Sequence, residues 1–269
     1  MSHYVVSVKP APVSPSPAAT LVLLRDRPGG GVEVLLMQRH RNSKFAAGDF
    51  AFPGGKLEPG DTPPDAAAWC AGLDVVEAAR VLDLSHAHDT ALAYWVGAIR
   101  ETFEEVGLLL ARDAAGAEAR IDAPRFVDHR RACAADNRAF WTMVRTEGLT
   151  LATDRLVYFA HWITPEDQPY RFDTRFFAAP APAAQDALRD DREAIDLRWL
   201  APEDAPGAME RGEISLRRPT AMNLAMFAGA ASTRDALARL AGRTVRTVRP
   251  RVIVENGVRR VVHEDAAGP

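Results

Sequence analysis

The sequence is poor in cysteine and carries little net charge. Its 269 residues include two cysteines, Cys70 and Cys133, and the formal net charge is −3. Two isolated thiols form neither a disulfide framework nor a zinc site, so the composition favours a reducing, cytoplasmic compartment. A weakly acidic chain has no overall attraction for nucleic acid or for anionic membranes. Any polyanionic ligand must therefore be bound by local basic groups or through cations.

The sequence also lacks segments that would target or cross a membrane. No apolar run is long enough to span a bilayer. Near the N-terminus, residues 4–6 are too short for the apolar part of a signal peptide, and prolines follow at positions 10, 12, 15 and 17. We therefore expect a cytoplasmic protein without membrane contact.

Three segments are expected along the chain. Residues 1–17 are rich in proline and alanine and predict a flexible arm. The chain is 47% hydrophobic and 26% charged, which is typical of a globular protein with a buried core, and we assign residues 18–242 to that domain. Residues 243–269 form a C-terminal extension, in which Asn256–Gly257 between two β-branched runs predicts a β-hairpin.

Within the domain, some apolar residues recur at the spacing of a helix and others at the spacing of a strand, which predicts a mixed α/β fold. Strands are predicted over residues 19–24, 32–37, 155–163, 171–178 and 197–200. Helices are predicted over residues 65–83, 89–105 and 219–240. Residues 40–61 hold four glycines and no sustained period, so a loop is expected there.

Acidic residues are concentrated on the predicted helix that ends before Gly107. Positions three and four apart share one face of a helix, so Glu101, Glu104 and Glu105 converge. Crowded carboxylates repel one another, and hard oxygen ligands of this kind suit Mg²⁺ or Mn²⁺. Arg100 can pair with a neighbouring carboxylate and hold it in place. Taken alone, this short pattern is more often a solvated acidic helix face.

A glycine-rich segment upstream changes this interpretation. Adjacent glycines in Phe52-Pro53-Gly54-Gly55 let the backbone approach a metal or a phosphate closely. The two segments together resemble the box of the Nudix hydrolases: Gly, five residues, Glu, seven residues, then Arg-Glu-apolar-x-Glu-Glu-x-Gly-apolar. Gly55 opens the box, Asp61 stands where Glu is usual, and Thr102 replaces an apolar residue. The largest departure is the spacer, since residues 62–99 are 38 residues where the pattern has seven.

The residues before the box narrow the resemblance. The segment from Leu35 to Arg39, followed by Lys44 and the Phe52-Pro53-Gly54-Gly55 run, is similar to the signature of the coenzyme A diphosphatases. Residues 162–177 are similar to the mammalian peroxisomal members of that subfamily, which also carry an insertion inside the box. The structural alternative is that Arg39 and Lys44 are solvated cations at a strand end.

The resemblance implies a fold, a reaction and a set of site residues. The fold is an α/β/α sandwich around a mixed sheet, with a helical insertion in the box. The reaction splits the diphosphate of coenzyme A or acyl-coenzyme A into adenosine 3′,5′-bisphosphate and 4′-phosphopantetheine or its acyl form, with Mg²⁺ or Mn²⁺. The expected metal ligands are Glu101, Glu104, Glu105 and the carbonyl of Gly55. The expected catalytic residues are Arg100, Glu101 and, as a candidate base, Glu193. The expected substrate-binding residues are Arg39, Lys44, Gly54 and Gly55.

The insertion, residues 62–99, is not composed like a linker. Apolar residues from Trp69 to Leu84 recur at near-helical spacing, so we expect an ordered helical excursion packed on the domain or on a partner subunit. Its ends should return to the glycine loop and the catalytic helix, because the cost of closing a loop grows only logarithmically with its length. Since it lies beside the box, we expect it to form one wall of the acyl or pantetheine pocket.

Other functions fit some of the same residues. A Nudix diphosphatase for ADP-ribose, a nucleoside diphosphate sugar or a related derivative would carry this box. A catalytically inactive ligand sensor would also have the fold, but it has no need of a full carboxylate cluster. Six arginines between Arg243 and Arg260 suggest RNA, yet no aromatic residue interleaves with them. A solvated hairpin or the edge of a homodimer is preferred there over a nucleic-acid site.

Overall fold

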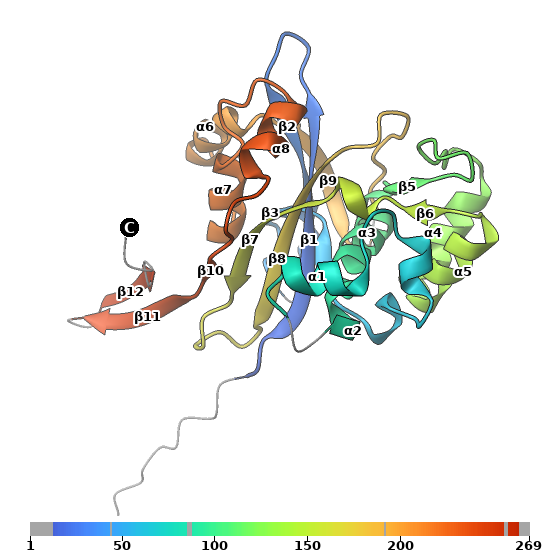
Figure 1. Cartoon of the computed structure of the whole chain (residues 1–269). Helices are drawn as coiled ribbons and strands as arrows, with labels where there is room; N and C mark the ends of the chain where they lie inside the picture. Colours follow the sequence, from blue (N-terminus) through green and yellow to red (C-terminus); the bar gives the residue numbers. More distant parts are fainter. Residues whose placement is uncertain (1–12, 44, 85–87, 191, 256–257, 264–269) are drawn as a thin grey trace, which may run out of the picture.

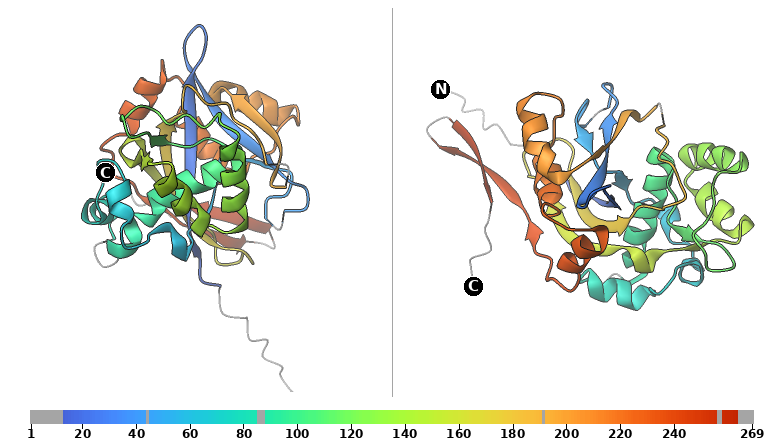
Figure 2. Two further views of the ribbon diagram at one scale, coloured as in Figure 1. Left: turned by 90° about the vertical axis from the view of Figure 1, so that its right-hand side faces the viewer. Right: turned by 90° about the horizontal axis from the view of Figure 1, so that it is seen from above.

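The computed structural model describes residues 13–263 except 44, 85–87, 191 and 256–257. A mixed sheet lies between two layers of helices (Figures 1 and 2), so the expected α/β/α sandwich is confirmed. One layer contains α1 (Val75–Val81), α2 (His88–Ala91), α3 (Ala93–Val106), α4 (Arg125–Ala135) and α5 (Arg138–Thr146). The other contains α6 (Ala205–Glu210), α7 (Arg218–Ala225) and α8 (Thr233–Leu240). In the described part of the chain, no helix is long and apolar enough to cross a membrane.

The sheet is organised around its longest strand, β1. Its strands are β1 (Ser16–Asp26), β2 (Val32–Arg39), β3 (Phe50–Ala51), β4 (Gly54–Lys56), β7 (Val157–Ile163), β8 (Phe172–Pro180), β9 (Ala194–Leu200) and β10 (Thr247–Val248). The order is β10-β7-β8-β1-β2-β3, with β4 paired to β1 and β9 to β2. β1 runs parallel to β8 on one side, while β4 and β2 pair with successive parts of its other side. The glycine-rich strand β4 therefore lies beside the central strand of the sheet.

Strand β1 supplies two separate cores because successive side chains point to opposite faces. Leu21 and Leu23 pack with α1, α3, α4 and α5, whereas Val22 and Leu24 pack with α6, α7 and α8. All four side chains are fully buried. The unbroken apolar run that predicts this strand thus corresponds to a central strand covered on both faces.

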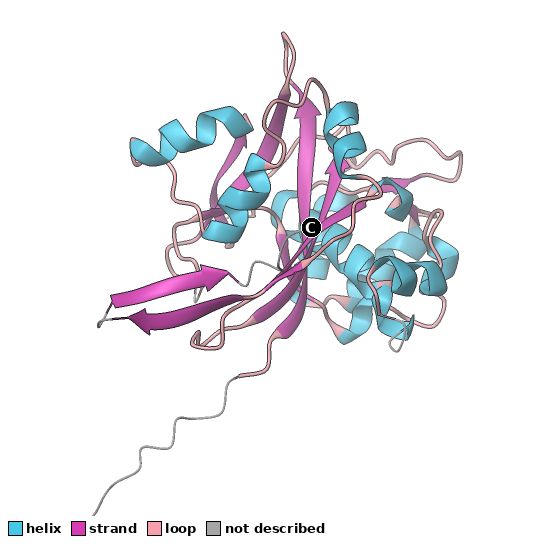
Figure 3. Cartoon of the chain, turned by 60° about the vertical axis from the view of Figure 1, so that its left-hand side comes forward, coloured by secondary structure: helices cyan, strands magenta, loops and turns pink. Residues whose placement is uncertain are grey.

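The C-terminal extension leaves the sandwich after β10. Strands β11 (Pro250–Glu255) and β12 (Val258–His263) pair in antiparallel register and project from the body (Figures 1 and 3). The predicted hairpin is confirmed, although its turn residues, Asn256 and Gly257, lie outside the described residues. At the other end of the chain, β1 begins at Ser16, within the segment expected to be an arm.

The prediction of one helix over residues 65–83 is wrong. A 3₁₀ turn, η2 (Ala66–Trp69), is separated from α1 by Gly72, which has a left-handed backbone with φ of 63°. Asp74 then caps α1 by accepting a hydrogen bond from the backbone N–H of Glu77 at 2.8 Å. The left-handed glycine interrupts the first turn, and the Asp74 cap then starts a new helix. Helices α4 and α5 were not predicted. The apolar residues of α4 are too sparse to show a clear period, whereas α5 buries Phe140, Trp141, Met143 and Val144 at helical spacing, a pattern that the sequence analysis missed.

The described residues of the insertion are ordered and partly helical, as expected. Helix α3 begins at Ala93, so the seven residues before Arg100 belong to the catalytic helix, and the inserted segment is 62–92. The apolar side of this segment contributes to the core on the α3 face. Its start is held by α5, since Arg145 forms an ion pair with Asp65 at 2.6 Å.

The pairing of β4 with β1 requires glycine at position 54. Gly54 has φ of 154°, and a Cβ there would lie 2.7 Å from Thr20 Cα and against the carbonyl of Ala19. We predict that Gly54→Ala lowers the free energy of unfolding by on the order of 1–3 kcal/mol, because backbone atoms cannot move aside. Urea denaturation measures the loss. In the control, Gly116→Ala, φ is 79° but no atom lies within 4 Å. Equal losses in the two variants would contradict the proposed clash.

Candidate active site

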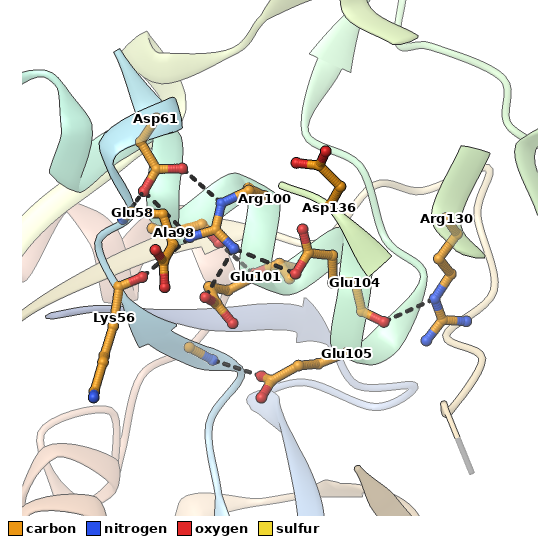
Figure 4. A network of polar contacts seen from close by, with 12 residues as sticks. Lys56, Glu58, Asp61, Ala98, Arg100, Glu101, Glu104, Glu105, Arg130 and Asp136 are labelled. Carbon is orange, nitrogen blue, oxygen red and sulfur yellow. Dashed lines mark hydrogen bonds and ion pairs between the residues drawn. The ribbon is translucent and has the colours of Figure 1, made fainter. Parts of the chain in front are cut away.

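Helix α3 holds its carboxylates above the glycine-rich strand β4 (Figure 4). The helix ends at Gly107, whose backbone is left-handed with φ of 70° and whose N–H donates to the carbonyl of Phe103 at 3.1 Å. Phe103 and Val106 are fully buried in the core. Burial of this apolar side fixes the rotation of the helix and turns its glutamates toward β4.

Arg100 is the centre of the polar contacts in Figure 4. Its Nε donates to Asp61 Oδ1 at 2.6 Å, and Nη2 donates to Asp61 Oδ2 at 3.2 Å. Both side chains are almost completely buried, at 3% and 1% exposure. Nη1 donates to Glu101 at 2.9 Å and to Glu104 at 3.3 Å, and Nη2 also reaches the carbonyl of Lys56 at 3.1 Å. One guanidinium thus joins the start of the insertion, the glycine loop and two carboxylates.

Asp61 takes the place of the usual Glu because the loop lies close against the helix. Its Oδ2 also accepts the backbone N–H of Glu58 at 2.8 Å. A Cβ on Gly97 of α3 would lie 2.8 Å from Leu57 Cδ2 and 3.2 Å from Asp61 Oδ2. Gly97 therefore permits the close approach that lets a shorter acid reach Arg100. The sequence analysis missed Gly97, although a glycine inside a helix often marks such an approach.

The two glycines of β4 lie against two of the helix glutamates, Glu105 and Glu101. The N–H of Gly54 donates to Glu105 Oε2 at 2.7 Å. A Cβ on Gly55 would lie 2.6 Å from the Glu101 carboxylate. Any side chain at position 55 would displace that carboxylate. The structure therefore brings together Gly54, Gly55, Glu101 and Glu105 as the sequence predicts.

Glu193 reaches the cluster from the loop before β9. Its backbone is fixed on both sides, because its N–H donates to the carbonyl of Asp190 at 3.0 Å and its carbonyl accepts the N–H of His40 at 2.9 Å. Its charge is close enough to raise the pKa of all three helix glutamates. The candidate base thus lies beside the three glutamates of α3.

The pKa of Glu101 is raised to about 7, that of Glu104 to about 8 and that of Glu105 well above its usual value, in each case mainly by burial. Neighbouring carboxylates contribute to each rise, whereas Arg100 opposes it at Glu101 and Glu104. For Arg100 itself, burial lowers the pKa, but the hydrogen bond to Asp61 and the nearby carboxylates outweigh it and raise the pKa overall. A further cation would allow these carboxylates to be ionised together.

The donor set suits a divalent cation. Among the described residues, no three acidic, histidine or cysteine side chains are close enough to enclose a metal by themselves. Arg100 engages two of the helix glutamates, and the Gly54 N–H engages the third. Yet Glu104 Oε1 is buried without a hydrogen-bond partner. This orphaned oxygen, among carboxylates that repel one another, fits a hard cation such as Mg²⁺ or Mn²⁺.

Glu101, Glu105 and Glu193 line a cavity of about 900 Å³. Its aromatic lining comprises Phe45, Phe50, Phe52, Trp162, Phe172 and Phe176. A smaller, polar cavity of about 540 Å³ adjoins the same cluster and is lined by the loop between α4 and α5. Among the described residues of the insertion, none lines either cavity. The expectation that the insertion forms a wall of the pocket is therefore wrong. The insertion packs on the α3 face of the sheet, whereas the start of α7 and Pro250 of β11 line the large cavity.

The predicted substrate-binding cations have different outcomes. Arg39 lines the large cavity, and its Nε donates to the carbonyl of Phe45 at 3.3 Å. Its charge lowers the pKa of Glu105, so it lies near the carboxylate end of the cavity. Lys44 lies outside the described residues.

The sequence analysis missed Arg130 of α4, whose Nε donates to the carbonyl of Glu104 at 2.9 Å.

The fold agrees with comparisons to known proteins. Residues 75–227 match the family model of the NUDT19 Nudix domain, and residues 15–68 match that of the NUDIX domain. The chain is 26% identical over 272 residues to acyl-coenzyme A diphosphatase NUDT19 of Homo sapiens, which covers 85% of this chain and 72% of the human protein. Against the Gallus gallus protein of that name it is 26% identical over 242 residues, which covers 76% of this chain and 63% of the chicken protein. The crystal structure of a NUDIX hydrolase from Alicyclobacillus acidocaldarius is similar with a TM-score of 0.70 and 27% identity, covering 86% of this chain and 99% of that chain.

Removal of the Arg100 guanidinium should destabilise the fold. We predict that Arg100→Met lowers the free energy of unfolding by on the order of 3–5 kcal/mol, because Asp61 is left buried without its partner. Urea denaturation followed by circular dichroism measures this. Arg120→Met is the matched control, since Arg120 pairs with Asp122 on the exposed surface and its loss should leave the midpoint unchanged. A wild-type midpoint for Arg100→Met would show that the pair is not structural.

Proposed function

The chain belongs to the Nudix hydrolases, in the family of the NUDT19 Nudix domain, and from this premise we propose that it splits the diphosphate of coenzyme A or an acyl-coenzyme A. Members of this superfamily are hydrolases that act on pyrophosphate bonds. The products here are adenosine 3′,5′-bisphosphate and 4′-phosphopantetheine or its acyl form. The human and chicken relatives are named acyl-coenzyme A diphosphatases, which supports this substrate class.

The observation that carries the proposal is the composition of the large cavity. Its volume of about 900 Å³ lies at the upper end of the range typical of ligand pockets, about 300–1,000 Å³. Carboxylates and a glycine strand form one end, and aromatic side chains form the walls. A diphosphate fits the first part, and a nucleoside or an apolar chain fits the second. Coenzyme A thioesters combine these groups in one molecule.

We assign the cation to Glu101, Glu104, Glu105 and the carbonyl of Gly55. When bound, a divalent cation such as Mg²⁺ or Mn²⁺ polarises phosphoryl oxygens and lowers the pKa of a bound water. Arg100 acts through its neighbours, because it holds two of these carboxylates against the glycine loop. Its contribution to catalysis is therefore to position the ligands.

Other residues contact the substrate or accept its proton. Glu193 lines the cavity beside the helix glutamates and is assigned as the base that takes a proton from the attacking water. Arg39 lies near Glu105 and is assigned to the diphosphate, where a guanidinium forms charge-assisted hydrogen bonds with phosphate oxygens. Gly54 and Gly55 leave room for the same group. Lys44 is retained as a substrate residue on the strength of the family resemblance.

Product analysis tests the proposed substrate directly. The full chain is incubated with Mg²⁺ or Mn²⁺ and, separately, coenzyme A, an acyl-coenzyme A, ADP-ribose and a nucleoside diphosphate sugar. Mass spectrometry should detect adenosine 3′,5′-bisphosphate and the phosphopantetheine product, with the highest kcat/KM for the coenzyme A compounds and no turnover in EDTA. Faster hydrolysis of ADP-ribose or of the sugar nucleotide would assign the enzyme to another Nudix substrate class. Binding without turnover of any compound would indicate a ligand sensor.

Neutralising one helix glutamate should separate activity from stability. We predict that Glu104→Gln and Glu105→Gln each lower kcat on the order of 100-fold or more, because a ligand charge is lost while the shape is kept. Thermal stability without metal should be maintained, since burial already disfavours the ionised carboxylate at either position. Glu77→Gln on α1 is the control, because Glu77 pairs with Arg80 outside the cavity. Near-normal turnover of both variants at saturating Mg²⁺ would refute the assignment of these ligands.

A further inference from the structure

We propose that Arg218 binds a second anionic group of the substrate, a phosphate monoester on the ribose, and so selects substrates that carry it. This inference rests on the proposed function, because it assigns a further subsite of the same cavity. Arg218 is the first residue of α7 and lines the large cavity. It lies outside the box and outside the upstream signature that led to Arg39 and Lys44.

Among the residues that the structure describes, five basic ones line the cavity: Arg39, Lys56, Arg192, Arg217 and Arg218. The other three arginines already have an assigned partner. Arg192 pairs with Asp190 at 2.6 Å, and Arg39, which lies near Glu105, is assigned to the diphosphate. Arg217 Nε donates to Asp49 at 2.6 Å. By contrast, the Arg218 side chain has no acidic partner and no hydrogen-bond acceptor in the described part of the chain. Lys56 is similarly unpaired, but it belongs to β4 at the carboxylate end.

The wall that carries Arg218 is fixed to the sheet. Asn223 of α7 is buried and accepts a hydrogen bond from Trp162 Nε1 of β7 at 3.2 Å. Leu224, in the next position, is buried in the core on that face. Arg217 is tied to Asp49, and its guanidinium lies 5.6 Å from the centre of the Phe45 ring. Arg218 is thus presented to the cavity from a rigid helix.

The two charged parts of the cavity come from opposite helical layers. The carboxylates are on α3, and Arg218 is on α7, across the sheet (Figure 1). A substrate whose only anionic group is a diphosphate binds at the α3 carboxylates through the cation, and it leaves Arg218 without a ligand. A guanidinium presents a fork of donors that matches phosphate oxygens, and it prefers a dianion. A ribose that carries the diphosphate on one oxygen and a phosphate monoester on another offers an anionic group to each part at once.

The test compares two substrates that differ only in this phosphate, coenzyme A and dephospho-coenzyme A. We expect Arg218→Ala to lower kcat/KM for coenzyme A about ten- to hundredfold, mainly through KM, as for loss of a charge-assisted hydrogen bond. Dephospho-coenzyme A should change by about twofold or less, and Arg218→Lys should retain part of the preference. Arg234→Ala is the matched control, because Arg234 is an exposed arginine in the first turn of α8 that does not line the cavity. An unchanged ratio of the two kcat/KM values in Arg218→Ala overturns the subsite.

A binding measurement separates this inference from the proposed function. Calorimetry compares adenosine 3′,5′-bisphosphate with AMP, which lacks the 3′-phosphate. The wild type should bind the bisphosphate about tenfold more tightly, and Arg218→Ala should remove this preference. If the wild type hydrolyses neither coenzyme but shows this preference, the proposed function fails and the subsite stands. If the wild type binds both nucleotides equally, or Arg218→Ala keeps the preference, the subsite is wrong whatever the enzyme hydrolyses.

Discussion

The buried ion pair between Arg100 and Asp61 is the interaction on which the site depends. A buried charge without its partner is strongly destabilising, so the chain must bring these two residues together in the folded state. The pair closes the chain around the insertion, residues 62–92, and fixes the glycine loop against α3. The remaining donors of Arg100 then hold Glu101 and Glu104 beside β4. A long insertion is tolerated because it leaves this closure intact.

The parts of the site that could be predicted from sequence are those set by local spacing. Carboxylates three and four apart lie on one helix face wherever the helix packs, and adjacent glycines permit close backbone approach in any context. Even the departure at Thr102 has a local cause: its hydroxyl donates to the carbonyl of Ala98 at 2.7 Å, so a polar residue fits a fully buried position. The helix boundary at Gly72 was missed because apolar spacing continues across the turn.

The rest could not be predicted because it depends on contacts between distant segments. Glu193 was suggested by the resemblance to the Nudix hydrolases, and only the folded chain places it beside α3. The cavity wall joins Phe45, Trp162, Arg218 and Pro250, which share no motif and come from four separate parts of the chain. Sequence proximity to the box suggested the insertion instead, but the insertion packs behind α3. Spatial neighbours of a site follow from the order of strands in the sheet, and a single sequence does not encode that order in a local pattern.

The structure therefore divides the work between its two helical layers. The α3 layer concentrates negative charge that a divalent cation balances, and the α7 layer contributes apolar surface and arginine. The central claim is that the carboxylates held by Arg100 bind that cation. Electron paramagnetic resonance of Mn²⁺ titrated into the full chain tests it most directly. The account predicts saturable binding to the wild type that is lost when Glu104 is replaced by Gln. Absence of saturable binding, or equal binding by the variant, would contradict it.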